Sequence, residues 1–253
     1  MNEVRDLALL IDAGVPIIAI ETHEEPRALQ LLSQLAIQRN LPMLSWTITD
    51  GLRRSDITGQ KPQPDSCDPE AALEQLKQNP QANLAVLCDF HHYLNGQPRI
   101  TRLLKDIALQ AESSGQTLIL MGHALDIPKD IERLCAGFNL TLPSEAQLMR
   151  VIHQEAQQWS SKQRGKRVNM ADNAISQLAK SMRGLSLDEA KRLARGAIVD
   201  DGAITESDID AVNRAKFALM NMDSVLSYEY DTEKCAQVAG FKRLTHWLTI
   251  RKD

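Results

Sequence analysis

The sequence contains no long apolar run. No stretch of its 253 residues approaches the ~18 consecutive apolar residues that a membrane-spanning helix needs. The N-terminus, MNEVRDLALLIDAGVP, is acidic and has no basic segment ahead of its short apolar stretch, so we expect an amphipathic helix and not a signal peptide. These absences predict a cytoplasmic protein without a membrane partner.

A basic excess and paired cysteines are missing as well. The formal net charge is -4, whereas a protein that binds duplex DNA usually carries an excess of Lys and Arg, so a nucleic-acid partner is not expected. Cys67, Cys88, Cys135 and Cys235 are far apart and form no CxxC motif, which excludes the usual zinc-ligand spacings. Scattered cysteines are typical of a reducing cytosol.

Over residues 1–143, short apolar runs alternate with segments of helical spacing. The runs at residues 14–20, 43–49, 83–89 and 117–122, and a weaker one at 138–142, predict five strands. Residues 24–39 and 99–114 have the apolar periodicity of helices, which Asn40 and Gly115 are expected to end. Asp68 followed by Pro69 predicts the start of a short helix, and Pro128 is expected to begin another that runs to about residue 136. Residues 50–68, which hold two glycines and two prolines, are predicted to be a loop. This alternation predicts an α/β fold with a parallel sheet covered by helices on both faces.

The pattern changes at Pro143. Ser144 with Gln147, and Ser186 with Glu189, have the spacing of capping boxes at helix N-termini. From there on the sequence predicts only helices, at about residues 145–159, 170–182, 187–200 and 206–222. We therefore expect a second, helical domain over residues 144–222, interrupted by a basic hinge, SKQRGKR. The pattern of residues 223–253 is not decisive.

Several passages in this order resemble an AAA+ ATPase module. In LAVLCDFHHYL an apolar strand ends in Asp89, which resembles a Walker B strand, whose carboxylate helps to hold Mg²⁺. The next strand ends in MGH, so His123 occupies a position similar to the family's sensor-1 residue. FNLTLPSEAQLMRVI resembles the passage from the last strand into the helical lid, and LAKSMRGLSLDEAKRLARGAI resembles the lid itself. The resemblance implies a five-stranded AAA+ core followed by a small helical lid.

The phosphate-binding loop of that family is absent. After the first strand the sequence reads IAIETHEEPRALQLL, without the glycines that let backbone N–H groups approach phosphate and without the lysine. We interpret five residues as a vestigial loop: Glu21, Thr22, His23, Glu24 and Glu25. Their carboxylates would repel a polyphosphate. Phe90 follows Asp89 where the family has its catalytic glutamate, so we expect Asp89 to be a vestigial Walker B residue and this chain to have no catalytic residue.

The C-terminal stretch makes the resemblance to one particular AAA+ family more specific. VAGFKRLTHWLTIRKD is similar to the lead that precedes an AAA+ core. Together with AIETHEEPRALQLL, LCDFHHYL and LILMGHALDIPKDIERL, it resembles the first half of the AAA+ ATPases named after a hypothetical chloroplast reading frame, found in plastids, cyanobacteria and other bacteria. In that family a degenerate N-terminal half precedes an active ATPase half.

This resemblance implies a division of labour. Residues 223–253 would be a linker towards a second AAA+ module, which would bind ATP and Mg²⁺, while this chain itself would need no cofactor. The whole protein would be an oligomeric ATPase that remodels an unknown protein substrate. This chain would orient, regulate or oligomerise the following module and would not itself be an enzyme.

Two alternatives stay open at this point. The first is a nucleic-acid-handling scaffold, similar to the clamp-loader subunits that lack a phosphate loop, which would use Lys162, Arg164, Lys166 and Arg167. The second is a metal-dependent enzyme with ligands from Asp89, His91 and His123, since neighbouring parallel strands would bring these positions together. His91 and His92 cannot easily share one metal, because adjacent side chains diverge.

Overall fold

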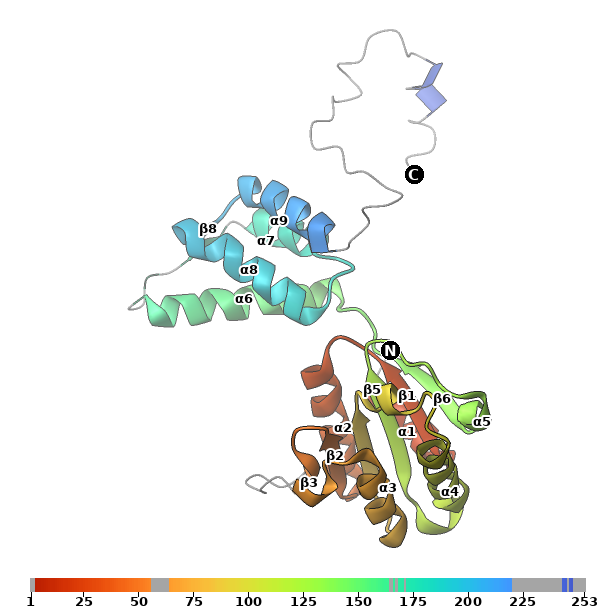
Figure 1. Ribbon diagram of the computed structural model, residues 1–253. Coiled ribbons are helices and arrows are strands. Elements are labelled where there is room, and N and C mark those ends of the chain that lie inside the picture. Colours follow the sequence, from red (N-terminus) through yellow and green to blue (C-terminus); the bar gives the residue numbers. More distant parts are fainter. Residues whose placement is uncertain are drawn as a thin grey trace. The chain divides into compact units, whose positions relative to one another are not determined.

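The computed structural model describes residues 3–55, 64–163, 166, 168–170, 172–219, 243–244 and 246–247 (Figure 1). The chain divides into two compact units, Met1–Thr141 and Leu142–Asp253. Among the helices of the described ranges, none is long and apolar enough to cross a membrane.

The first unit alternates strands with helices. Its elements are α1 (Glu3–Asp12), β1 (Ile17–Glu21), α2 (Glu25–Arg39), β2 (Met43–Thr47), β3 (Gly51–Arg54), η1 (Pro64–Ser66), α3 (Pro69–Gln78), β4 (Leu84–Cys88), η2 (Phe90–Tyr93), α4 (Pro98–Ser114), β5 (Thr117–Gly122), α5 (Lys129–Glu132) and β6 (Cys135–Asn139).

The strands form one sheet in the order β3-β2-β4-β5-β1-β6. The five parallel strands that the sequence predicts are present, so the predicted α/β fold is confirmed. The sheet gains a sixth strand, β3, which pairs antiparallel with β2 inside the predicted loop. Within this pair Leu52 lies opposite Trp46; it is buried, and its N–H donates to the Ser66 hydroxyl at 2.7 Å.

Two further boundaries differ from the sequence prediction. Strand β6 begins at Cys135, which pairs with Ile17, three residues earlier than the predicted start at residue 138. The helix expected to begin at Pro128 and run to about residue 136 is only the short α5, because the chain has already entered β6 there. In both cases strand pairing with β1 sets the boundary.

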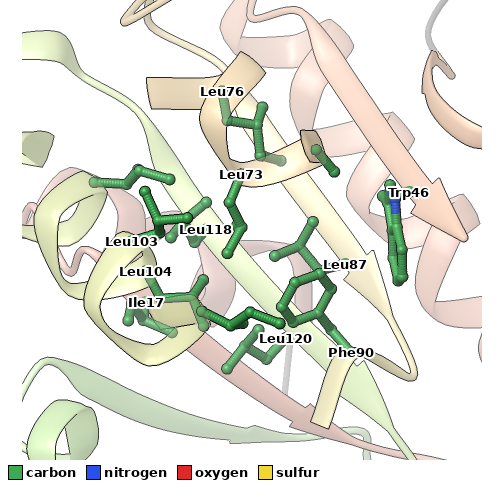
Figure 2. Packing of buried hydrophobic residues seen from close by; sticks show 14 of the residues in the cluster. Ile17, Trp46, Leu73, Leu76, Leu87, Phe90, Leu103, Leu104, Leu118 and Leu120 are labelled. Atoms are coloured by element: carbon green, nitrogen blue, oxygen red, sulfur yellow. The ribbon is translucent and has the colours of Figure 1, made fainter. Parts of the chain in front are cut away.

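Side chains alternate between the two faces of the sheet and build two apolar clusters. Ala85, Leu87, Leu118 and Leu120 pack against α3 and α4, as Figure 2 shows for the labelled residues of this cluster. Their strand neighbours, such as Val86, Ile119 and Met121, face α1 and α2. Because both faces are covered, the central strands read as continuous apolar runs and not as alternating ones.

Local signals fix most helix ends where the sequence places them. Asn40 ends α2 in the left-handed conformation, with φ 52°, and Gly115 ends α4 with φ 69°. The Asp68 side chain accepts a hydrogen bond from the Ala71 N–H at 2.9 Å and caps α3, which Pro69 begins.

The second unit is mainly helical. Its elements are α6 (Glu145–Lys162), β7 (Asn169–Met170), α7 (Asp172–Ser181), α8 (Leu187–Asp201), β8 (Ala203–Ile204) and α9 (Glu206–Leu219). Both expected capping boxes are formed. The short parallel pair β7–β8 was not predicted, since a two-residue strand has no detectable periodicity.

The helices of this unit enclose a core of their own. Leu148 and Ile152 of α6 pack with Leu178 of α7 and Ile198 of α8. Arg195 of α8 donates to the buried Glu155 carboxylate of α6 at 3.0 Å. The linker predicted over residues 223–253 lies outside the described residues, apart from two pairs of helical positions, 243–244 and 246–247.

Candidate functional site

The carboxyl ends of the central strands gather most of the residues that the sequence singles out. β4, β5 and β1 lie side by side and end at Cys88, Gly122 and Glu21. Backbone hydrogen bonds tie their following residues together: the Thr22 N–H donates to the Gly122 carbonyl at 2.8 Å, and the Asp89 N–H donates to the Met121 carbonyl at 2.7 Å. In sheets of this kind, ligands bind at this edge.

The connection from β1 to α2 is short, and several of its backbone groups make hydrogen bonds within the protein. It consists of Thr22, His23 and Glu24. The Glu24 N–H donates to the Thr22 hydroxyl at 2.9 Å, and the Glu24 carbonyl accepts the N–H of Ala28 at 3.0 Å. Pro26, in the first turn of α2, has no N–H at all. This connection therefore offers few of the free backbone donors that a phosphate needs at a helix N-terminus.

An ion-pair network centred on Arg27 stabilises the same connection. Glu24 is 6% exposed and accepts a hydrogen bond from Arg27 at 2.7 Å. Arg27 also donates to Glu3 of α1 at 2.8 Å and to the Thr141 carbonyl at 3.1 Å. Burial disfavours the charged guanidinium, but Glu24 and Glu3 outweigh it and raise the pKa of Arg27. The guanidinium is held by the two carboxylates and by the Thr141 carbonyl.

The remaining carboxylates keep the edge acidic. Glu21 accepts the Leu125 N–H at 3.0 Å and so holds the segment after β5. Glu25 and Asp89 both line a cavity of about 380 Å³, together with Cys88. Burial, followed by the charges of Glu25 and Asp89, raises the pKa of the Cys88 thiol to about 12. The cavity is large enough for a small ligand, but its two carboxylates disfavour an anion.

Asp89 and Phe90 turn the chain out of β4. Asp89 has φ 53°, a left-handed conformation that aspartate tolerates better than most residues, and its side chain is exposed. Phe90 is fully buried and packs edge-on against Trp46, with ring centroids 4.9 Å apart (Figure 2). The position that the resemblance assigns to a catalytic glutamate is therefore occupied by a core residue.

Four of the six histidines meet at this edge. Their rings form a chain: His91 lies 4.0 Å from His92 and 5.9 Å from His123, and His123 stacks at 5.7 Å on His23, all measured between ring centroids. The metal site predicted from the sequence joined His91 with His123 but did not include His23 and His92. The signal was available, because each of β1, β4 and β5 is followed by a histidine within three residues.

The metal alternative is not favoured by this arrangement. Within the described part of the chain, no group of three or more His, Cys, Asp or Glu residues could hold a metal ion.

The nucleic-acid alternative gains no support either. Lys162, at the end of α6, and Lys166 are exposed, while Arg164 and Arg167 lie outside the described residues. The overall charge of -4 still opposes a nucleic-acid surface.

Comparison with solved structures places the fold among AAA domains. The crystal structure of the FIGL-1 AAA domain in complex with ADP matches 85% of this chain and 81% of its own chain, with a TM-score of 0.54 and 11% identity. PCH-2 of C. elegans matches with a TM-score of 0.52 and 11% identity, over 86% of this chain and 66% of its own. Identities this low establish the fold alone.

Sequence relatives extend over the whole chain. An uncharacterized AAA domain-containing protein ycf46 of Guillardia theta is 25% identical over 99% of this chain and 48% of its own length. The ycf46 protein of Pyropia yezoensis is 23% identical over 99% of this chain and 49% of its own length. The chain thus spans about half the length of the curated relatives that it matches.

Two family models divide the chain between them. The N-terminal domain of SpoVK-like AAA ATPases matches residues 3–140, and the second domain of the same proteins matches residues 146–223. These matches and the ycf46 relatives confirm the predicted resemblance to the reading-frame family. The chain therefore belongs to the SpoVK-like AAA ATPases.

Proposed function

We propose that this chain is a catalytically inactive AAA+-like module that orients, regulates or oligomerises an ATPase module following it in a longer protein. ATP and Mg²⁺ would be bound by that second module and not by this one. The whole protein would be an oligomeric ATPase that remodels a protein substrate in the cytoplasm. Residues 144–222 would serve as the helical lid.

One observation carries this proposal: the backbone donors of the connection from β1 to α2 are used within the protein or are missing, so few are available for a phosphate. The Glu24 and Thr22 N–H groups donate within the protein, and Pro26 removes a further donor. No glycine occurs between Ile17 and Arg39 that would let a phosphate approach the backbone. The FIGL-1 AAA domain binds ADP in its crystal structure; we expect this chain to differ because its connection lacks these donors.

Two further features support an inactive module. Phe90 occupies the place of the catalytic glutamate and is part of the core, so no single substitution there would restore a water-activating group without opening a cavity. In addition, curated relatives are about twice as long as this chain, which leaves room for a second module.

The first test is a titration of the chain with a fluorescent ATP analogue and Mg²⁺, with and without excess unlabelled ATP. We expect no competable binding into the high micromolar range. Competable binding, or Mg²⁺-dependent hydrolysis that Asp89→Ala abolishes, would refute the inactive assignment. The Asp12→Ala variant, altered far from the edge on α1, is a control for non-specific loss.

The supporting role is tested separately on the longer protein. Its ATP hydrolysis and its mass in sedimentation should both be compared with a form that lacks residues 1–222. We expect either the hydrolysis rate or the oligomer size to change. If neither changes, the module does not orient, regulate or oligomerise its neighbour, whatever the titration shows.

A further inference from the structure

The histidine chain links three separate connections of the sheet edge. His23 follows β1, His91 and His92 belong to η2 after β4, and His123 follows β5. The rings touch in the order His92, His91, His123, His23. A change of charge on one imidazole is therefore felt by its neighbours in the other connections, because like charges at 4–6 Å repel.

His91 is the buried member of the chain. It is 7% exposed, and its Nδ1 has no hydrogen-bond partner. The ring lies against Gly122, where a Cβ would come within 2.8 Å of both Nδ1 and Cε1. A neutral ring can keep its proton on Nε2, whereas a protonated ring must bury an unpaired N–H at Nδ1. Burying such a group costs about 1–3 kcal/mol. The position of the ring against Gly122 therefore favours the neutral form of His91.

The charged groups around His91 can be named element by element. Its own turn contributes Asp89 and His92, the segment after β5 contributes His123, and the segment after β1 contributes His23 behind His123. Burial first, then His92, and to a smaller degree His123, lower the pKa of His91, and Asp89 opposes them. Glu21 accepts a hydrogen bond from the Leu125 N–H, and Glu25 lines the same cavity as Asp89 and His92.

The sign of the pH dependence follows from this balance. A histidine whose pKa is lower in the folded than in the unfolded state stabilises the fold fully above the unfolded value, near 6.5. That stability is lost as the pH falls through this value towards the lower pKa of the folded state. Acidification therefore lowers the stability of the arrangement in which the neutral His91 ring is buried against Gly122.

We propose that the four histidines form a proton-operated switch at the carboxyl edge of the sheet. Protonation of the His91 ring would bury an unpaired N–H at Nδ1, so it expels the ring from its position against Gly122 and loosens η2 and the segment after β5. The hydrogen bonds from Thr22 to Gly122 and from Asp89 to Met121 join backbone atoms and persist, so the sheet stays intact. The edge changes its surface with pH while the core remains folded.

The test is an NMR titration of the whole chain between pH 8 and pH 5, following the histidine ring signals and the backbone amides. We expect His91 to titrate below 6.5 with a Hill coefficient below one, because protonation of neighbouring rings is anticooperative. The amides of His92, Leu94 and Leu125 should shift with the same midpoint. The amide of Leu76, in the core on α3, should not.

Three variants complete the experiment. His91→Gln should abolish the shared amide shifts, while His153→Gln, altered at an exposed histidine of α6, should leave them unchanged. If His91→Gln does not fold, His123→Gln is the second variant: removal of an exposed neighbour that lowers the pKa of His91 should raise its midpoint. A His91 that titrates independently near 6.5, or amide shifts spread over the whole core, would overturn the proposal.

Discussion

The His91 imidazole packs directly against the backbone of Gly122, at the point where η2 meets the end of β5. A Cβ at position 122 would lie 2.8 Å from Nδ1 and Cε1 of that ring. Gly122 is also opposite Glu21 in the register of β1 and β5. The glycine at the end of β5 is thus explained by a ring from η2, the turn that follows β4.

This contact predicts the effect of Gly122→Ala. We expect a loss of about 1–3 kcal/mol in the free energy of unfolding, because the added methyl group overpacks a buried ring. Urea unfolding followed by circular dichroism measures it. Gly137→Ala is a matched control, since Gly137 also lies in a strand and a Cβ there meets nothing within 4 Å.

The same contact makes the two residues interdependent. In a double-mutant cycle with His91→Ala, the cost of Gly122→Ala should fall by more than about 0.5 kcal/mol, since the clashing ring is gone. Additive costs would show that the alanine at 122 is accommodated without meeting His91.

Arg27 is predicted to be the main electrostatic support of the β1–α2 connection. Replacement by Met should destabilise the chain by about 3 kcal/mol, because Glu24 stays buried without its guanidinium partner. Arg39→Met, which breaks the exposed pair with Asp12, should cost less than about 1 kcal/mol. Equal costs in urea unfolding would contradict the importance of burial for this pair.

In the helical unit, replacement of Gly202 is predicted to be more destabilising than replacement of another glycine with positive φ. Gly202 ends α8 with φ 73°, and a Cβ there would lie 2.6 Å from the Trp159 ring. Gly184 has φ 90° but open space around it, so Gly184→Ala reports backbone strain alone. We expect Gly202→Ala to lower the unfolding free energy by at least about 1 kcal/mol more than Gly184→Ala does. Thermal unfolding of both variants provides the comparison.

The Cys88 thiol is predicted to react very slowly with disulfide reagents in the folded protein. It is 4% exposed and its pKa is raised to about 12, so the thiolate that reacts with disulfide reagents is scarce at pH 8. We expect labelling of Cys88 at least ~100-fold slower than that of the half-buried Cys67, read from peptide masses. In denaturant the two rates should converge. Fast labelling of Cys88 in native conditions would mean that the edge of β4 opens readily.

Local signals account for much of what could be predicted. Asp68, Ser144 and Ser186 cap their helices as the spacing indicates, because a cap needs only residues within one turn. The central strands were found because strands buried on both faces have an unmistakable apolar run. β3 was missed, since it depends on pairing with β2 and on a hydrogen bond from Leu52 to Ser66, fourteen residues away.

The features of the candidate site also fall into those that the sequence shows and those that only the folded chain shows. The absence of glycine and lysine after β1, and the phenylalanine after Asp89, can be read directly from the sequence. The contacts of Glu24 with Arg27 and of Arg27 with Glu3 and Thr141 required the folded chain, because they join three segments. The stacking of His23 on His123 likewise depends on β1 and β5 being neighbours in the sheet.

The sequence by itself determined the fold class, the change from an α/β to a helical region near Pro143, and the absence of glycine and lysine after the first strand, since periodicity, caps and missing residue types are properties of short stretches. Only the tertiary structure decided which strand ends meet and therefore which histidines touch. It also decided that His91 is buried without a partner at Nδ1. Strand order places residues that are about a hundred positions apart within contact distance, and no local pattern encodes that distance.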